Sequence, residues 1–443
     1  LSRPVTGEFE NVISEINSLK CKSGDSSFCD SDGIFNVISR PQDKSGISEM
    51  GSDNIFIFSI DVPSGISADS GRIMNIAVKA DHTITFGFMK QGLLLYPGAQ
   101  YAGEVTVANI GFPECALRQV RLNTFYFDKK DLRRLPERKE YSNKGTYGRV
   151  LIIAGSEGMS GAAYLSAKAA YKTGAGLVKV LTSKENRVIL QTSLPEAVFA
   201  AYDEESPGKE SGNKEDPGRE DKNKEDIREE EWREEMAAVI RWASVIVIGP
   251  GLGQSEMAQK LLELTISEAQ VPLIIDADGL NMLAGRMDSL CTDTKSRWEY
   301  LSGLLPADTV LTPHVMEFSR LTGLPVSEIT DNMIDTDVLS SYNKDLIIAV
   351  KDARTVVARR EKRYINVSGN NGMATGGSGD VLTGIIAALI AQKMLPFQAV
   401  CLAVYIHGLS GDAAAEKKNV YSLMAGDVID SIETVMKGSS PID

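Results

Sequence analysis

The sequence lacks two features that would place the protein in a membrane or on nucleic acid. No apolar run approaches the roughly 20 residues that a membrane-spanning helix needs. The 443 residues carry a net charge of -13, whereas nonspecific nucleic-acid binding needs a basic surface. With 43% apolar and 24% charged residues, the composition is typical of a soluble protein, so we expect neither a membrane nor nucleic acid as partner.

Cysteine is scarce and scattered. The five cysteines contain no CxxC pair, which disfavours a disulfide framework and a structural zinc site. The first residues also lack the basic and apolar regions of a secretory signal. We therefore expect a reducing, cytoplasmic location. Because the chain begins at Leu1 rather than Met, we also expect it to be a fragment whose upstream segment, with any targeting signal, is unseen.

The negative charge is concentrated in residues 203–235, which contain 15 acidic and 7 basic side chains. Almost no apolar side chains are available there to offset the entropy of ordering, so we predict a charged, solvated insertion. Its last part, from Asp226 to Ala238, is compatible with a helix. An acidic docking site is the alternative. A second polar stretch, Lys20 to Asn54, is predicted to be a loop or insertion.

The chain is long enough for two domains, and its pattern changes near Asn123. We expect a first domain at 1–113, a linker at 114–123 and a second domain at 124–443. In the second domain short apolar runs alternate with helical stretches, which predicts a parallel sheet covered on both faces. The predicted strands are Arg149–Ala154, Val178–Leu181, Val245–Ile248, Leu273–Ile275, Thr309–Leu311, Leu346–Val350 and Thr355–Val357. Ligands of such sheets bind at the carboxyl ends of the strands.

The strongest chemical signal is the segment GNNGMATGGSGDVLTGIIA at 369–387. Its glycine-rich turn runs directly into an apolar helix from Val381, so free backbone N–H groups and the positive helix end would face an anion. Asp380 stands at the start of this helix, where it would act on a group beside the anion. The plain structural alternative is that Asp380 only caps the helix.

Residues 369–387 resemble the GSGD anion-hole motif of the ribokinase-like superfamily, and GNNGMAT is similar to its branch that dehydrates NAD(P)H hydrates. The resemblance covers nearly all of residues 124–438 and implies an α/β fold, a ribokinase-like three-layer αβα domain. Further stretches that agree in order and spacing are KGTYGRVLIIAGSEGMSGAAYLSAKAAYKTGAGLVKV at 144–180, IGPGLG at 248–253, IIDADGLNML at 274–283, LTPHVMEFSRLTG at 311–323 and VKDART at 350–355.

The resemblance also implies roles for individual residues. Asp380 would be the catalytic base and, with Ala162, Gly251 and His314, would line the hydrate side of the site. For His314, helix capping or packing is the alternative. ADP, or ATP in its place, would be held with Mg²⁺ bridging its phosphates. The residues implied for the nucleotide are Lys351, Asp352, Ala353, Arg354, Thr355, Asn371, Gly372, Met373, Ala374, Thr375, Gly376, Gly377, Ser378 and Gly379.

The chain departs from the family pattern at three places. Asn143 replaces a histidine, Val315 and Met316 replace a Pro-Gly pair, and Asp352 replaces a glycine. The first two changes affect loop residues and local geometry. A carboxylate at Asp352 would repel nucleotide phosphates unless a cation lies between them, so nucleotide affinity is the property at issue.

The N-terminal part resembles the latter half of an NAD(P)H-hydrate epimerase domain, a Rossmann-like fold, through IFSIDVPSGISADSG at 57–71 and YAGEVTVANIGFP at 101–113. The resemblance implies that Asp61 binds substrate and that Ser64 contacts a potassium ion. Their structural alternatives are a strand-end carboxylate and a turn serine. Because the first half of such a domain is missing, a sheet edge would be exposed and we do not expect epimerase activity.

These observations predict an ADP-dependent dehydratase that returns the S-form of NADH or NADPH hydrate to NADH or NADPH. Phosphoryl transfer to the ring hydroxyl would precede elimination of phosphate. One alternative is a ribokinase-like kinase of a small alcohol, which shares the GSGD chemistry. Another is a noncatalytic nucleotide-binding regulatory protein, against which the retained Asp380 argues. We also expect a homo-oligomer.

Overall fold

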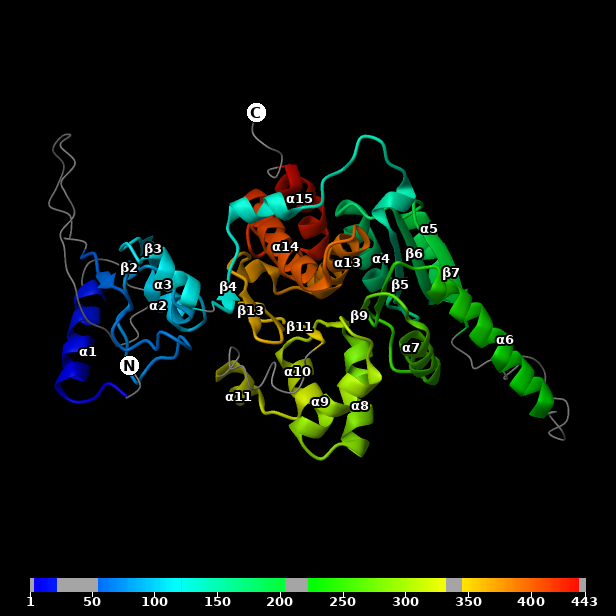
Figure 1. The fold of residues 1–443 in the computed structure, drawn as a ribbon, viewed down its shortest axis with the longest axis horizontal. Coiled ribbons are helices and arrows are strands. Elements are labelled where there is room, and N and C mark those ends of the chain that lie inside the picture. The colour runs from blue at the N-terminus through cyan, green and yellow to red at the C-terminus, as the bar shows by residue number, and fades with distance from the viewer. Residues whose placement is uncertain (1–3, 22–54, 121, 204–221, 332–344, 438–443) are drawn as a thin grey trace. The chain divides into compact units, whose positions relative to one another are not determined.

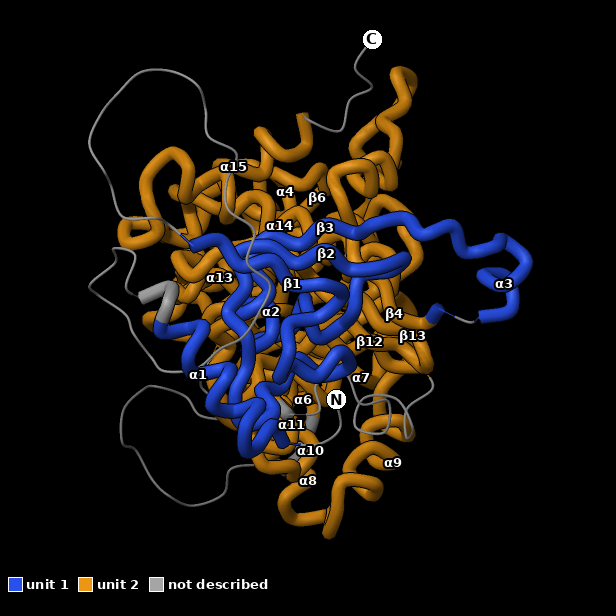
Figure 2. The backbone as a smooth tube through the Cα atoms, turned by 90° about the vertical axis from the view of Figure 1, so that its left-hand side faces the viewer, with its two compact units in different colours: residues 1–122 blue, residues 123–443 orange. Residues whose placement is uncertain are grey.

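The structure is a computed structural model that describes residues 4–21, 55–120, 122–203, 222–331 and 345–437. The chain divides into two compact units, residues 1–122 and 123–443 (Figure 2). None of the described helices is both long and apolar enough to cross a membrane. The polar stretch predicted at Lys20 to Asn54 lies almost wholly outside the described residues, and so do residues 204–221 of the charged insertion.

The second unit is built on a ten-stranded sheet with the order β4-β13-β12-β11-β10-β9-β8-β5-β6-β7. From β11 to β7 every neighbouring pair is parallel. The strands are β4 (Thr124–Phe125), β5 (Arg149–Ile153), β6 (Leu177–Ser183), β7 (Val198–Tyr202), β8 (Val245–Ile248), β9 (Leu273–Ile275), β10 (Val310–Leu311), β11 (Ile347–Val350), β12 (Val356–Arg359) and β13 (Lys362–Ile365).

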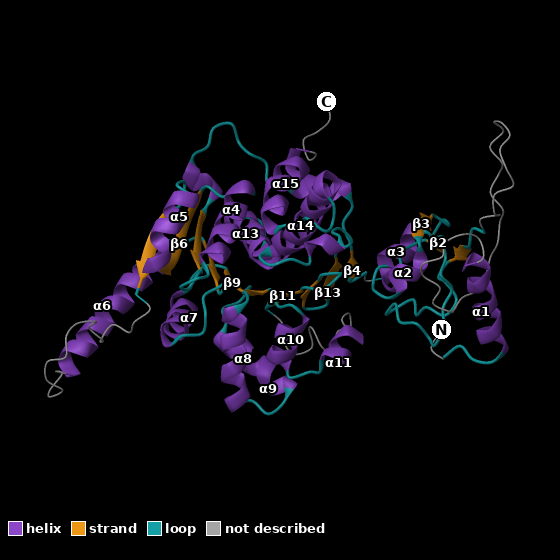
Figure 3. Ribbon diagram, turned by 180° about the vertical axis from the view of Figure 1, so that it is seen from behind, coloured by secondary structure: helices purple, strands orange, loops and turns teal. Residues whose placement is uncertain are grey.

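Helices cover this sheet on both faces, in the three layers expected (Figures 1 and 3). One layer holds α4 (Ser160–Lys172), α5 (Arg187–Ser193), α13 (Ser378–Ala391), α14 (Pro396–Lys418) and α15 (Ala425–Lys437). The other holds α7 (Glu256–Glu268), α8 (Asp278–Leu290), α9 (Thr294–Leu304), α10 (Val315–Thr322) and α11 (Val326–Asp331), and α6 (Lys222–Arg241) packs on α7. Short 3₁₀ turns are η2 (Lys129–Arg134), η3 (Lys144–Tyr147), η4 (Lys184–Asn186) and η5 (Asn371–Met373).

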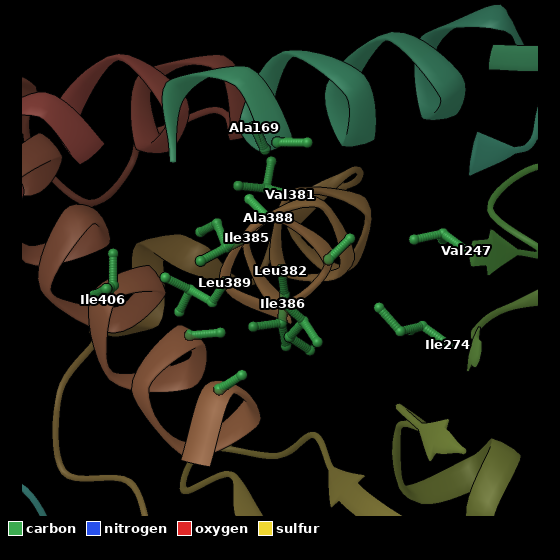
Figure 4. Close-up of a cluster of buried hydrophobic side chains, with 14 of the residues drawn as sticks. Ala169, Val247, Ile274, Val381, Leu382, Ile385, Ile386, Ala388, Leu389 and Ile406 are labelled. Carbon is green, nitrogen blue, oxygen red and sulfur yellow. The ribbon is translucent and has the colours of Figure 1, made fainter. Parts of the chain in front are cut away.

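Helix α13 is the centre of the core. Every residue from Val381 to Ala391 is buried, because α13 packs against α4, α14 and the sheet. A helix that is apolar all round is stable only when it is enclosed in this way. Figure 4 shows Ile385, Ile386 and Leu389 of α13 among side chains from neighbouring elements. The core therefore fixes the position of the glycine-rich turn at the start of α13.

The sheet differs from the prediction at one end. Strand β12 runs antiparallel to both β11 and β13, whereas a wholly parallel sheet was expected. The connections are too short for the crossover that parallel neighbours require, so the chain turns back on itself. Strands β4, β7 and β13 were not predicted. The helix predicted at 226–238 is present and longer, since α6 spans Lys222–Arg241.

The first unit contains a parallel three-stranded sheet in the order β1-β2-β3. Ile13 and Ile16 of its first helix share a small apolar core with Ile57, Ile76, Val78 and Ala80. Its elements are α1 (Glu8–Cys21), β1 (Phe58–Ile60), β2 (His82–Phe86), η1 (Gln91–Leu93), α2 (Gly98–Ala102), β3 (Glu104–Ala108) and α3 (Glu114–Gln119). Helix α3 lies in the segment that was expected to be a linker, and none of its residues is buried.

Candidate active site

The glycine-rich turn ends at Gly377, which is the N-cap of α13 and has a φ of 87°. A side chain there would be strained by this φ, and its Cβ would lie 2.4 Å from Cδ1 of Leu165 in α4, so the backbone conformation requires glycine and Leu165 packs closely over it. The first helical hydrogen bond runs from Val381 N–H to the Gly377 carbonyl at 3.1 Å. The preceding amides of Gly379 and Asp380 therefore have no partner within the helix, as the anion-site prediction requires.

Asp380 lies in the first turn of α13 and is not its N-cap, which excludes the capping alternative. Its main-chain carbonyl accepts a hydrogen bond from Ser166 Oγ of α4 at 2.9 Å, which anchors the backbone. Among the described residues, none donates a hydrogen bond to its carboxylate. Burial and the charges of Asp276 and Asp278 together raise the pKa of Asp380 to about 7, and the Lys351 charge opposes the rise. A carboxylate with this pKa exchanges protons near neutral pH.

Asp276 and Lys351 form an ion pair next to Asp380. Lys351 Nζ lies 2.7 Å from Asp276 Oδ1, and the carboxylate is only 1% exposed. The pair also adjoins the glycine turn, because a Cβ built on Gly379 would lie 3.2 Å from Lys351 Nζ. Lys351 was predicted to bind nucleotide, and the structure shows its ammonium group already paired with a buried carboxylate. The partner, Asp276, was quoted in a motif but was assigned no role.

Ala162 and Gly251, which were both predicted on the hydrate side, lie against each other. A Cβ built on Gly251, whose φ is 57°, would be 2.8 Å from Cβ of Ala162. Two residues on, Gly253 N–H donates to Asp278 Oδ2 at 2.9 Å. These contacts connect the turn after β8 to the start of α4, which follows β5, and to the start of α8, which follows β9, at the carboxyl ends of adjacent strands. Ala162 and Gly251 therefore lie at one edge of the sheet, and Asp278 is one of the charges that raise the pKa of Asp380.

His314 is the N-cap of α10. Its Nδ1 accepts N–H groups of Met316 at 3.1 Å and Glu317 at 3.3 Å. Nε2 then carries the ring hydrogen and lies 3.3 Å from Glu317 Oε1. The imidazole remains 49% exposed, and His314 forms a β-bridge with Lys351. The structure thus gives His314 the capping role that was the alternative, and places it beside the Asp276–Lys351 pair.

Glu317 belongs to the same group of charges. Burial raises the pKa of Glu317; Lys351 lowers it, Asp276 raises it, and contacts to His314 lower it. Its Oε2 accepts the His314 main-chain N–H at 2.9 Å, which completes a capping box at the start of α10.

The two predicted nucleotide segments meet. Arg354 Nη1 donates to the Val367 carbonyl at 2.9 Å, which links residues 351–355 to the chain that leads into 369–379. Residues 371–373 form η5, whose N-cap Asn370 accepts the Gly372 N–H at 3.0 Å. Asp352 and Ala353 are exposed, as are Asn371, Ala374 and Gly376. Asn143, one of the departures from the family pattern, caps η3.

In the first unit, Asp61 has a φ of 66° and its Oδ1 is surrounded by donors. Lys90 Nζ lies at 2.5 Å, the Phe86 N–H at 3.0 Å and Thr85 Oγ1 at 3.1 Å. Burial raises the pKa of Asp61, but hydrogen bonds from Lys90, Phe86 and Thr85 and the Lys90 charge together hold it below its ordinary value. Ser64 is exposed, and its carbonyl accepts the Val78 N–H at 2.8 Å.

Comparison with known proteins decides the family. The NAD(P)H-hydrate dehydratase family matches residues 150–434, and a family described as the YjeF-related protein N-terminus matches residues 32–92. The bifunctional NAD(P)H-hydrate repair enzyme of Thermofilum pendens is 35% identical over 393 residues, which are 87% of this chain and 68% of that enzyme. This chain belongs to the NAD(P)H-hydrate dehydratase family. Its predicted family and enzyme class, that of a lyase, are therefore confirmed.

Other relatives agree. The Escherichia coli bifunctional NAD(P)H-hydrate repair enzyme is 31% identical over 86% of this chain and 65% of that enzyme. An ADP/ATP-dependent NAD(P)H-hydrate dehydratase from Bacillus subtilis, co-crystallised with ATP/Mg²⁺, has a TM-score of 0.54 and 27% identity over 72% of this chain and 99% of its own. A ribokinase-like superfamily protein from Enterococcus faecalis has a TM-score of 0.55 and 28% identity, over 72% of this chain and 97% of its own. The predicted ribokinase-like α/β fold is confirmed. The chain spans about two thirds of the length of the curated bifunctional relatives.

Two elements of the site were not found from the sequence. The Asp276–Lys351 pair joins residues 75 positions apart, and His407, which contacts Ser378 at 3.3 Å, is 29 positions from its partner. Asp276, Lys351 and His407 each lie in or next to an apolar stretch, and a buried strand or helix is enough to account for that stretch. Only an uncompensated charge or a polar residue within such a stretch would have drawn attention to them.

Proposed function

We propose that this chain catalyses the ADP-dependent dehydration of the S-form of NADH or NADPH hydrate, with Asp380 as general base. The observation that carries the proposal is the geometry around Asp380. A carboxylate with a pKa of about 7 and no hydrogen-bond donor among the described residues stands next to unpartnered amides of a glycine-rich turn. The first feature suits proton abstraction, and the second suits a phosphate.

The chemistry follows from the poor leaving ability of hydroxide. Asp380 accepts the proton of the ring hydroxyl while the hydroxyl oxygen attacks the terminal phosphorus of ADP. The bond from that phosphorus to the oxygen that bridges the two phosphates breaks, which releases AMP. The amides of Gly379 and Asp380 would stabilise the charge on the transferring group. The carbon–oxygen bond of the phosphorylated ring then breaks, phosphate leaves with the electron pair, and loss of a proton from the adjacent carbon restores the double bond.

Within this proposal Ala162, Gly251 and His314 line the hydrate side, and residues 351–355 and 371–379 hold the nucleotide. Lys351 is bound to Asp276 in the structure, so its contribution is to the charge near the phosphates and to the pKa of Asp380. Its pairing with a buried carboxylate also joins the turn after β9 to the end of β11, beside Gly379 of α13.

Mg²⁺ fits this arrangement. The described residues contain no group of three or more His, Cys, Asp or Glu that could hold a metal ion. Mg²⁺ usually keeps several waters and is bound by one or two carboxylates together with substrate phosphates, so a protein cage is not needed. Asp352, an exposed carboxylate in the nucleotide segment, is the residue that would hold it. When bound, Mg²⁺ would neutralise charge on the nucleotide phosphates, including the repulsion that Asp352 would otherwise cause.

The proposal is tested by incubating the protein with NADH hydrate, Mg²⁺ and either ADP or ATP. The expected result is nucleotide-dependent recovery of dihydronicotinamide absorbance, faster with ADP. Release of AMP and phosphate in equal amounts should accompany it. No recovery with either nucleotide, together with phosphorylation of a small alcohol, would instead identify a ribokinase-like kinase. Tight nucleotide binding without any turnover would identify a regulatory protein.

Three further predictions accompany the proposal. A homo-oligomer is tested by light scattering, and a cytoplasmic location by cell fractionation. A potassium site at Ser64 is tested by potassium titration of the first unit's thermal stability. In the first unit, the Asp61 carboxylate accepts a hydrogen bond from Lys90, and the Ser64 carbonyl accepts one from the Val78 N–H. Because both groups already have partners within the unit, this proposal assigns the first unit no activity.

A further inference from the structure

His407 contacts the glycine-rich turn, although sequence analysis gave it no role. It lies on α14, and its Nε2 is 3.3 Å from Ser378 Oγ, the hydroxyl on the first residue of α13. The other histidines are His82 in the first unit and His314 at the start of α10. His407 is thus the histidine that touches the proposed phosphate turn.

Helix α14 supports the glycine-rich segment at both ends. Five residues beyond His407, Asp412 Oδ2 accepts a hydrogen bond from the Gly369 N–H and Oδ1 accepts one from Asn370 Nδ2, each at 2.9 Å. Asp412 therefore fixes the beginning of the segment through the Gly369 backbone and the Asn370 side chain. The contact at the other end is different, because the side-chain atom that His407 meets is a hydroxyl that adjoins the proposed anion site.

The imidazole of His407 is neutral at physiological pH. Burial and the Lys351 charge together lower the pKa of His407 to about 4, and a hydrogen bond to the Ser378 main chain opposes this shift. A neutral imidazole has one nitrogen that donates and one that accepts. If Nε2 accepted the Ser378 hydroxyl hydrogen, the hydroxyl would offer only lone pairs to a phosphate. If Nε2–H donates, the hydroxyl hydrogen is free for a phosphate oxygen.

We propose that His407 is a positioning residue whose Nε2–H donates to Ser378 Oγ, so that the Ser378 hydroxyl donates to a phosphate oxygen of the nucleotide. This inference rests on the proposed function, because it requires nucleotide phosphates at residues 376–379. It adds a side-chain donor to the backbone amides of the turn. The imidazole acts through Ser378 and touches neither substrate.

A double-mutant cycle tests the inference. Ser378→Ala and His407→Leu should each weaken ADP binding by about tenfold to a hundredfold, the usual range for a hydrogen bond to a charged group. The double variant should be no weaker than Ser378→Ala, since His407 acts only through that hydroxyl. His407→Gln offers an amide N–H in a similar place and should restore most of the affinity. Calorimetric ADP titration measures each value, and the KM for the hydrate should stay nearly unchanged.

The matched control is His82→Leu, which removes a histidine of the first unit and should leave ADP affinity unchanged. Additive losses in the double variant would overturn the inference, as would full affinity in both single variants. If His407→Leu does not fold, Ser378→Ala and His407→Gln still decide: Ser378→Ala with wild-type ADP affinity overturns the inference. If the wild-type protein binds neither ADP nor ATP, the proposed function falls together with the inference.

Discussion

Asp61 of the first unit and Asp380 of the second were both predicted to be site residues, and the structure gives them opposite environments. Three donors converge on the Asp61 carboxylate and lower its pKa despite partial burial. Asp380 has no donor to its carboxylate among the described residues, has two aspartates nearby, and has a raised pKa. A carboxylate held as an ion by donors is a poor base, whereas one that burial and like charges destabilise can take a proton at neutral pH.

The comparison is tested most strongly by Asp380→Asn. An amide keeps the size of the side chain but cannot accept the hydroxyl proton, so turnover of the hydrate should fall by about 100-fold to 10,000-fold. ADP affinity should be nearly unchanged, because the phosphate contacts come from backbone amides and the helix end. Steady-state turnover and calorimetric ADP titration separate the two effects.

The matched control is Asp293→Asn, at an exposed N-cap that asparagine fills equally well. It should leave turnover unchanged. Near-full turnover in Asp380→Asn would make the two aspartates equivalent, and the mechanism would be wrong.

The pH dependence distinguishes the two carboxylates next. The lowered pKa of Asp61 keeps it ionised in the neutral range, so it supplies no limb there, whereas Asp380 with its pKa of about 7 does. Because the base must be ionised, kcat/KM should fall as the pH drops below about 7 and should approach a tenfold loss per pH unit. Asp276→Asn removes a negative charge and frees Lys351, so the limb should move to lower pH.

Lys351→Met should move the same limb to higher pH, since it removes the cation that opposes the raised pKa. It also leaves the Asp276 carboxylate buried and unpaired, which typically costs about 3–5 kcal/mol of stability, so its folding must be checked by circular dichroism. Identical limbs in the wild type and Asp276→Asn would show that Asp380 is not the group that titrates.

His314 provides a third test, because the fold uses its hydrogen-bonding capacity much as it uses that of Asp61. If it also contacts the hydrate, His314→Ala should raise the KM for the hydrate by about tenfold and spare ADP affinity. His314→Asn keeps the cap on α10 and should fail to restore the KM. Restoration by asparagine would mean that His314 serves only the helix.

The sequence predicted the parallel centre of the fold because its strands are continuous apolar runs with both faces buried. It did not predict strands that contain charged or exposed residues. In β13 the charged Arg363 is 1% exposed, and its Nη1 donates to the carbonyls of Arg360 and Lys362, so a residue type that is rarely buried occupies a buried strand position. The edge strand β7 is partly exposed and carries a weaker apolar signal.

The candidate site divides in the same way. The glycine-rich turn and Asp380 are contiguous, so a local motif predicts them. The pair of Asp276 with Lys351 and the contact of His407 with Ser378 arise from the packing of distant segments, which no local period encodes. The opposite pKa shifts of Asp61 and Asp380 also depend on neighbours in space, so the sequence alone predicted neither shift.

The pH dependence of the free energy of unfolding should show the smallest difference between Asp61 and Asp380. The folded-state pKa of Asp380, about 7, lies above its ordinary value of 3.8. Between these values the folded protein holds a proton that the unfolded chain has lost, so the contribution of Asp380 to stability is present at low pH and is lost as the pH rises through 7. Asp380→Asn avoids the buried charge and should raise the free energy of unfolding above pH 7, by on the order of 1 kcal/mol because partial exposure reduces the limit of about 1.4 kcal/mol for each pKa unit. The gain should vanish toward pH 4.

The contribution of Asp61 to stability has the opposite pH dependence. It is present above the ordinary pKa of Asp61 and is lost as the pH falls through the lowered value. Asp61→Asn should therefore destabilise the first unit at neutral pH and progressively less in acid. Urea denaturation of both variants from pH 4 to pH 8 measures these differences, and curves of the same sign for the two would remove the distinction between a carboxylate held as an ion and one kept ready to accept a proton.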